Sequence, residues 1–353
     1  MQVQSIKGYL RKNKVSFMVC ITPNHEIKNF SFYRKLKKYT NTKVVIFLPE
    51  ERDLFYDFTK KSGRIRIEKL LKSNNIELEW WLSDPSADHI PSGIKGMKII
   101  NWPLYTVPWT WYMMEHQDIK PIQKFNKIFI TLNNKPRKHR YWLMDEIYKR
   151  QLQNDGYITW HGPDCQKNIW LKKEPTYYFK NKLLTLDAFD PKQQGRIPEE
   201  FFKSFINVVA ETDHQKIDIT EKTYVPMICK KPFIIVGATG VHERLKYFGF
   251  RLFDFIDYSF DFEPDHKTRI SMIVEQIEQL RDKDLNTLYQ QSLPVLEHNY
   301  NRIQEIMYDN TYAPAEFRSI TKKVFVNKNQ YQLGATKWIH QNYYAKNISS
   351  TSS

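Results

Sequence analysis

Short apolar segments alternate with longer segments of helical spacing along most of this chain, and no other sequence feature constrains the fold as strongly. Runs this short, bounded by polar and turn-forming residues, are typical of strands in a covered sheet. Strands that alternate with helices predict an α/β protein whose sheets are mostly parallel. The apolar segments lie at residues 15–21, 43–48, 76–82, 97–100, 127–132, 157–160, 205–210 and 233–236.

Apolar side chains recur at helical spacing after several of these strands. The helices expected from this spacing lie around residues 30–36, 142–148, 220–228, 245–248 and 269–288, and residues 293–307 either extend the last helix or form another. Two segments interrupt the alternation. Residues 102–126 hold prolines among tryptophans and are expected to be irregular, and the polar residues 164–198 are expected to form an excursion.

The length of 353 residues exceeds a typical single core of about 100–200 residues, so two domains are expected. The irregular aromatic segment places their boundary near residue 121. The prediction is an N-terminal domain over residues 1–121, a second domain over residues 122–310 and a C-terminal extension over residues 311–353 with a disordered end. Open α/β sheets bind ligands at the carboxyl ends of their strands, so the chemistry is expected in the loops that follow strands.

The chain carries a formal net charge of +15, which indicates either an anionic partner or a solvated lysine-rich surface. Its three cysteines are far apart and match no disulfide framework or zinc spacing, so a reducing compartment and no metal are expected. No apolar run reaches the roughly 20 residues that span a bilayer, and the N-terminus lacks the apolar core of a signal peptide. A cytoplasmic protein without a transmembrane segment is therefore expected.

Glu211 follows the predicted strand 205–210, and a Thr-Glu-Lys triplet, Thr220 to Lys222, begins nine residues later. Thr220 is a suitable N-cap for the helix that follows, although Pro226 leaves open whether the helix begins there or near Thr223. Either start puts Lys222 and unpaired backbone N–H groups at the ligand edge of the sheet. This combination favours an anion such as a diphosphate, and Glu221 is suited to ribose hydroxyls; the alternative is a solvated charge pair.

Two phrases in the second half resemble a known enzyme family. Glu211, a nine-residue spacing and the stretch ITEKTYVPMICKKPFIIVG are similar to the pattern of the alpha-1,3-fucosyltransferase type of glycosyltransferase. The phrase NNKPRKHR, residues 133–140, also resembles the Asn…Arg loop of that superfamily. The resemblance covers about residues 127–260. Thr212 departs from the family pattern, which has asparagine there, so the donor sugar stays open and GDP-fucose is one candidate.

The resemblance implies a GT-B-like architecture, two Rossmann-like α/β domains facing across a cleft, and an inverting transfer without a metal or other cofactor. A sugar would pass from a nucleotide sugar to a hydroxyl of a glycan or another acceptor. The residues implied in donor binding are Lys222 for the diphosphate, Glu221 for the ribose, Thr220 at the helix start, and Arg140 as the second phosphate contact with Arg137 as its rival. Glu211 would be an active-site carboxylate near the donor.

An inverting transfer also needs a base that takes the proton of the acceptor hydroxyl. The first domain offers several candidates, of which Asp84 and His89 flank a Pro/Ser-rich loop after a strand; the others are Asp88, Glu115 and His116. Two other functions stay open at this point. One is nucleic-acid binding, which the charge of +15 favours. The other is an inactive interaction module that retains the fold.

Overall fold

The structure is a computed structural model, and it describes residues 15–18, 36–37, 40–47, 61–86, 93–114, 119, 122, 124–133, 137–160 and 197–309. The chain divides into two compact units, Met1–Tyr112 with Ile306–Ser353 (unit 1) and Met113–Glu305 (unit 2). The described residues form an α/β protein with parallel sheets, which confirms the fold class at that level. The domain limits expected from the sequence, and two domains facing across a cleft, stay predictions.

Unit 1 contains a four-stranded parallel sheet in the order β1-β2-β3-β4. Helix α5, between β2 and β3, packs against β3 and buries Ile67, Leu70 and Leu71. These side chains recur at i, i+3 and i+4, but basic and polar residues surround them, and α5 was not among the expected helices. The bounds are β1 Val15–Met18, β2 Thr42–Phe47, α5 Lys61–Asn74, β3 Ile76–Leu82 and β4 Met97–Asn101.

Unit 2 contains a second four-stranded parallel sheet, in the order β6-β5-β7-β8. Every residue of β7 and β8 is buried, as expected for parallel strands that are covered on both faces, although β8 lies at the edge of the sheet. All four apolar segments predicted as strands here are confirmed. The bounds are β5 Lys127–Asn133, β6 Gly156–Trp160, β7 Ser204–Ala210 and β8 Phe233–Val236.

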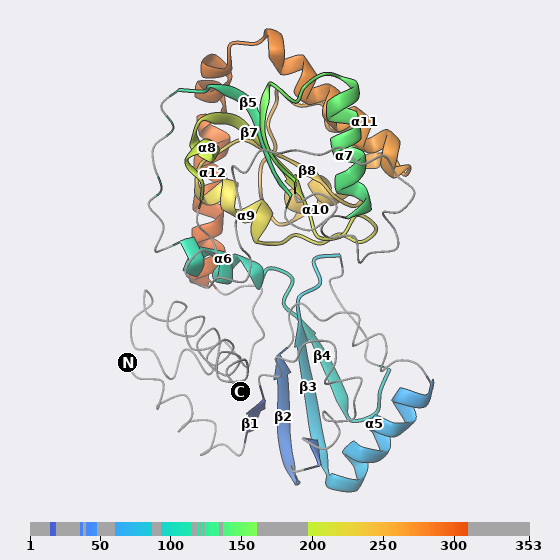
Figure 1. The fold of residues 1–353 in the computed structure, drawn as a ribbon. Coiled ribbons are helices and arrows are strands. Elements are labelled where there is room, and N and C mark those ends of the chain that lie inside the picture. Colours follow the sequence, from blue (N-terminus) through green and yellow to red (C-terminus); the bar gives the residue numbers. More distant parts are fainter. Residues whose placement is uncertain are drawn as a thin grey trace, which may run out of the picture. The chain divides into compact units, whose positions relative to one another are not determined.

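Helices cover both faces of the sheet in unit 2 (Figure 1). Helices α7 and α11 lie together on one face, while α9 and α12 lie on the other. The described helices of this unit are α7 Lys138–Lys149, α8 Glu199–Phe202, α9 Glu221–Ile228, α10 Val241–Tyr247, α11 His266–Glu278 and α12 Leu285–Asp309, the last of which ends in unit 1. In the described part of the chain, no helix has the length and apolarity that a membrane crossing requires.

The expectation of an irregular segment over residues 102–126 is wrong where α6, Thr106–Met114, forms. That expectation rests on the prolines that lie among the aromatic residues of this segment. Pro108, however, is the third residue of α6, and a proline in the first turn removes no intrahelical hydrogen bond.

The expectation of one helix over residues 269–288 is also wrong. Helix α11 ends at Glu278, a 3-10 helix follows over Gln279–Asp282, and α12 begins at Leu285. Asp284 starts the new helix, because its carboxylate accepts from the N–H groups of Asn286 and Thr287. The expected helix at residues 30–36 and the excursion at 164–198 lie almost wholly outside the described residues.

Candidate functional site

The strand order of unit 2 places a topological switch point between β5 and β7. The chain leaves β5 through α7 toward β6 on one side, and leaves β7 through α9 toward β8 on the other. The two helices therefore cover opposite faces (Figure 1). Open α/β sheets bind ligands outside the carboxyl ends of strands at such a point. Residues that follow Asn133 and Ala210 are thus the first to consider.

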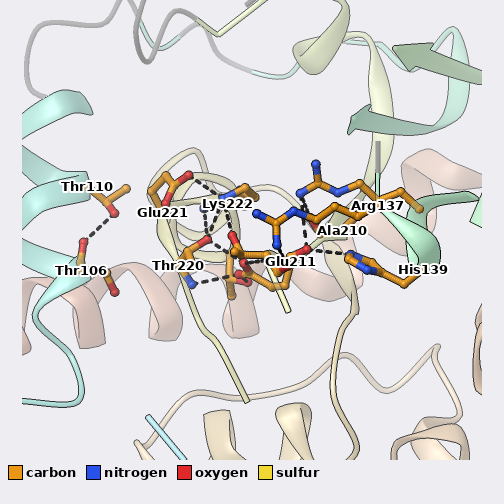
Figure 2. Close-up of polar contacts among 12 residues, drawn as sticks. Thr106, Thr110, Arg137, His139, Ala210, Glu211, Thr220, Glu221 and Lys222 are labelled. Carbon is orange, nitrogen blue, oxygen red and sulfur yellow. Dashed lines mark hydrogen bonds and ion pairs between the residues drawn. The ribbon is translucent and has the colours of Figure 1, made fainter. Parts of the chain in front are cut away.

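Glu211 follows the last residue of β7, and its carboxylate fixes the N-terminus of α9 (Figure 2). The side chain is fully buried. It accepts from the hydroxyls of Thr220 and Thr223, both at 2.6 Å, and from the backbone N–H of Thr220 at 3.0 Å and of Thr212 at 3.2 Å. Four donors satisfy a buried carboxylate, which makes Glu211 the link between strand and helix.

Thr220 is the N-cap of α9, so the helix begins with the triplet and Pro226 lies inside it. The Thr220 hydroxyl donates to Glu211 and accepts from the backbone N–H of Lys222 at 3.4 Å and from its Nζ at 3.0 Å. The Lys222 ammonium also donates to Glu221 at 2.7 Å and to the Thr212 hydroxyl at 3.3 Å. Neighbouring side chains therefore hold Lys222 at the start of α9.

The Glu221–Lys222 pair is charged at neutral pH. Burial lowers the pKa of Lys222, but the carboxylates of Glu221 and Glu211 outweigh burial and leave this pKa above its ordinary value. Burial raises the pKa of Glu221, and the Lys222 ammonium outweighs it, so the net pKa lies below the ordinary value. The two side chains are 31% and 32% exposed, so both charges are within reach of a ligand.

Three side chains at the start of α7 contact the backbone where β7 ends (Figure 2). Arg137 donates to the carbonyl of Thr212. His139 Nε2 donates to the carbonyl of Glu211 at 2.8 Å, and Arg140 donates to the carbonyl of Ala210 at 3.0 Å. These bonds tie the segment after β5 to the segment after β7 across the switch point.

Arg140 and His139 are buried, whereas Arg137 is half-buried. Burial and the neighbouring Arg137 lower the pKa of Arg140 to about 10, so Arg140 stays protonated at neutral pH. Burial and the Arg140 charge lower the pKa of His139 to about 3, so His139 is neutral. With Nε2 donating, neutral His139 has its lone pair on Nδ1, and this buried atom has no hydrogen-bond partner among the described residues.

The N-terminus of α7 adds backbone donors to these cations. Its N-cap, Arg137, forms no side-chain capping bond, and the first turn contains no acidic residue. A helix start without a cap leaves N–H groups available to an anion. Positive charge from Arg137, Arg140 and Lys222 therefore surrounds the carboxyl edge of β5 and β7.

The structure brings together six of the predicted site residues, and all six belong to unit 2: Arg137, Arg140, Glu211, Thr220, Glu221 and Lys222. Asp84 belongs to unit 1, where it is buried and accepts from the N–H of Ser86 at 2.9 Å. His89, Asp88, Glu115 and His116 lie outside the described residues. The role of His139 was missed, although it stands between the two arginines of the quoted Asn…Arg phrase.

Within the described residues, no group of three or more His, Cys, Asp or Glu side chains is arranged to hold a metal ion. Comparison of the chain with protein-family models, with curated proteins and with solved structures yields no match. The site must therefore be interpreted from its own geometry and charge.

Proposed function

We propose that this protein is a glycosyltransferase that moves a sugar from a nucleotide sugar to a hydroxyl acceptor. One observation carries the proposal: Arg137, Arg140 and Lys222 converge on the carboxyl edge of β5 and β7, beside the half-exposed carboxylate of Glu221. Cations with one adjacent carboxylate suit a ligand that joins a diphosphate to a ribose. The resemblance over residues 127–260 assigns the same residues to that ligand.

Lys222 binds the diphosphate in this proposal. Its ammonium lies at the N-terminus of α9, where the helix dipole also favours negative charge. A phosphate oxygen would replace one of the oxygens that now accept from Nζ. Glu221, released from Lys222, would then accept from the ribose hydroxyls.

The burial of the two arginines separates their roles. Arg140 is 3% exposed, and its guanidinium donates to the carbonyls of Ala210 and Glu211. Arg137 is half-buried and reaches the edge of the sheet. We assign Arg137 to direct contact with a phosphate. We assign Arg140 to holding the carboxyl end of β7 in position, and its buried positive charge also attracts the phosphate from a distance.

Glu211 is also a positioning residue in this proposal, because its carboxylate oxygens already accept from threonines and backbone N–H groups. It holds Thr220, and through Thr220 it holds Lys222, in place. It is therefore proposed to support the donor site without touching the reacting sugar.

The transfer would break the bond between the sugar carbon and the diphosphate oxygen and form a bond to the acceptor oxygen with inversion. The bonding electrons leave with the nucleoside diphosphate, where Lys222 and Arg137 stabilise the developing charge. A base takes the proton of the acceptor hydroxyl. Asp84 and His89 remain the proposed candidates for this base, no metal takes part, and the reaction is proposed to occur in the cytoplasm.

The test is a calorimetric titration of nucleotide sugars and free nucleoside diphosphates into the wild-type protein and into Lys222→Ala, Glu221→Gln and Lys203→Ala. Lys203 is a matched control, since it is an exposed lysine in an ion pair with Glu199 just before β7 begins, at the opposite edge of the sheet. Saturating binding of one nucleotide is expected in the wild type and in the control. Both site variants should weaken it, and Lys222→Ala should lower kcat by about 10²–10³-fold.

Absence of binding by every nucleotide, with a protein that unfolds cooperatively, would overturn the proposal. Binding that survives in Lys222→Ala would also contradict it. Nucleic-acid binding and a catalytically inactive interaction module would then become the leading alternatives.

A further inference from the structure

A cluster of imidazoles and cations surrounds Trp142 beside the proposed donor site. His214, from the segment between β7 and α9, lies 4.7 Å from His266 of α11 and 5.0 Å from His139 of α7, measured between ring centroids. Both His214 and His266 contact the Trp142 ring, at 5.8 and 6.4 Å. Three segments that are far apart in the sequence thus meet at this tryptophan.

Two lysines complete the cluster. The ammonium of Lys138 lies 4.9 Å from the centroid of the Trp142 ring, and that of Lys267 lies 5.4 Å from the same centroid. Both lysines are exposed, and His214 and His266 are half-buried. Each lysine lies in the first turn of its helix, Lys138 as the first residue of α7 and Lys267 as the second residue of α11, where the dipole also favours an anion.

Several donors in the cluster have no acceptor among the described residues. His266 Nδ1 accepts from Arg269 at 2.6 Å, so the neutral ring has its proton on Nε2, which points to no described acceptor. His214 makes ring contacts but no hydrogen bond to a described residue. Trp142 is 8% exposed, and its buried Nε1 lacks a partner in the same part of the chain.

Two carboxylates lie beside the histidines of the cluster. Asp213 accepts from the N–H of Gln215, and Asp265 caps α11 through Thr268. Lys138 and Lys267 balance these two carboxylates, while Arg269 faces Asp261, Glu263 and Asp265. Protonation of the histidines adds positive charge to the cluster. His139 stacks on His214, whereas His266 meets His214 edge to face. Among the described residues, no group of three or more His, Cys, Asp or Glu side chains is arranged to hold a metal ion, so we consider an anion as the ligand.

We propose that His214, His266, Lys138 and Lys267 form a second anion subsite that takes a phosphate-class group. The subsite adjoins the proposed donor site through His139, which stacks on His214 and donates to the carbonyl of Glu211. This inference goes beyond the proposed function, because the subsite requires no nucleotide sugar. The group it binds belongs either to a small phosphorylated ligand or to a nucleic-acid backbone.

Binding at this subsite is linked to proton uptake. Burial and the mutual repulsion of the histidines lower the pKa of His214, and burial and Arg269 lower that of His266. The charged or titratable groups facing them are Lys138 and His139 from α7, Asp213 from the preceding segment, and Asp265, Lys267 and Arg269 from α11. A bound dianion reverses the local potential and raises both pKa values, so it adds protons to the histidines.

The experiment is isothermal titration of inorganic pyrophosphate at pH 6.5 in two buffers of different ionisation enthalpy, which counts the protons taken up. The variants are His214→Gln/His266→Gln, Lys222→Ala and, as a control, His298→Gln. His298 is a half-buried histidine of α12 that contacts the carbonyl of Gly249, away from the cluster. Thermal unfolding of each variant verifies that it is folded.

Wild type and His298→Gln are expected to take up protons on binding, with affinity rising as the pH falls from 7.5 to 5.5. The double histidine variant should no longer take up protons, and its affinity for pyrophosphate at pH 6.5 should fall at least tenfold. Lys222→Ala should still take up protons on binding. Equal uptake in wild type and the double variant, or no uptake at all, would overturn the subsite. Loss of all binding in Lys222→Ala would show a single anion site and would overturn it as well.

A second titration uses a single-stranded oligonucleotide of mixed sequence under the same conditions. Binding with the same proton uptake, lost in the double histidine variant, would identify a phosphodiester backbone as the source of the anion. Binding of pyrophosphate without binding of the oligonucleotide would identify a small phosphorylated ligand. The subsite stands under either result, and it can fail while the donor site at Lys222 succeeds.

Discussion

His139 is a titratable residue of the proposed site whose pKa is strongly lowered by burial. It is 1% exposed, its Nε2 donates to the carbonyl of Glu211, and its pKa is lowered to about 3. A neutral imidazole is therefore part of the folded structure at every pH above that value. The unfolded chain, in contrast, binds a proton on this residue as soon as the pH falls below about 6.5.

This difference makes the stability of unit 2 sensitive to acid. Between pH 6.5 and 3 the unfolded state binds one more proton than the folded state, so stability is lost as the pH falls, by about 1.4 kcal/mol per pH unit. His139→Gln retains an Nε2 donor but does not titrate. Between pH 7 and pH 5, the unfolding free energy of the variant should rise by about 2 kcal/mol relative to that of the wild type, since only the wild type loses the contribution of His139.

Urea unfolding at the two pH values, followed by circular dichroism, measures this gain. His298→Gln is the control, because it removes another histidine of the same unit and keeps His139, so it should lose stability at low pH as the wild type does. A wild type and a His139→Gln variant that lose stability in parallel would contradict the assignment.

At the scale of elements, a single carboxylate joins α9 to β7. Glu211 accepts from Thr223 at 2.6 Å inside a fully buried environment, and both residues are 0% exposed. Thr223→Val retains the shape of the side chain but removes the hydroxyl, so it leaves a buried charge with one donor fewer. The expected cost is about 1–3 kcal/mol of unfolding free energy.

Thr223→Ser is the matched variant, since it retains the hydroxyl and removes only a methyl group. We expect it to lose clearly less stability than Thr223→Val in the same denaturant titration. Equal losses would mean that packing, and not the hydrogen bond to Glu211, holds the start of α9.

The strands of this fold could be predicted because each is a short run rich in apolar residues between polar turns, as FIIV in β8 and SFINVVA in β7 illustrate. The helices were harder to predict from the sequence. Pro108 suggested a break but lies in the first turn of α6, and the break between α11 and α12 depends on one capping carboxylate, Asp284. Such local bonds are weakly encoded in hydrophobic periodicity.

Some residues of the candidate site could likewise be predicted from the sequence, and others could not. Glu211 and the triplet Thr220 to Lys222 are close in the sequence, so their spacing alone predicted that they belong to one site. His214 and His266 are separated by one strand, two α-helices and a 3-10 helix, and only the packing of α11 against α7 brings them together at Trp142. Contacts made by tertiary packing leave no spacing signal in a single sequence.

For the whole molecule, the two units determine how ligand binding should appear in thermal unfolding. Each unit has its own parallel sheet and its own buried apolar residues, so two calorimetric transitions are expected. The residues of the proposed donor site, from Arg137 to Lys222, all belong to unit 2. A ligand that binds only the folded state stabilises the unit that binds it.

The transition of unit 2 can be recognised because Thr223→Val should lower its midpoint and leave the other unchanged. A nucleoside diphosphate at 100 times its Kd should then stabilise the same transition by about 2.7 kcal/mol. For a unit of this size that free energy corresponds to a rise in Tm of about 5–10 °C. Lys222→Ala should abolish the rise, whereas Lys203→Ala should retain it. If the ligand moves the transition that Thr223→Val leaves unchanged, then unit 1 supplies the binding residues, and the assignment of the donor site to the switch point between β5 and β7 is wrong.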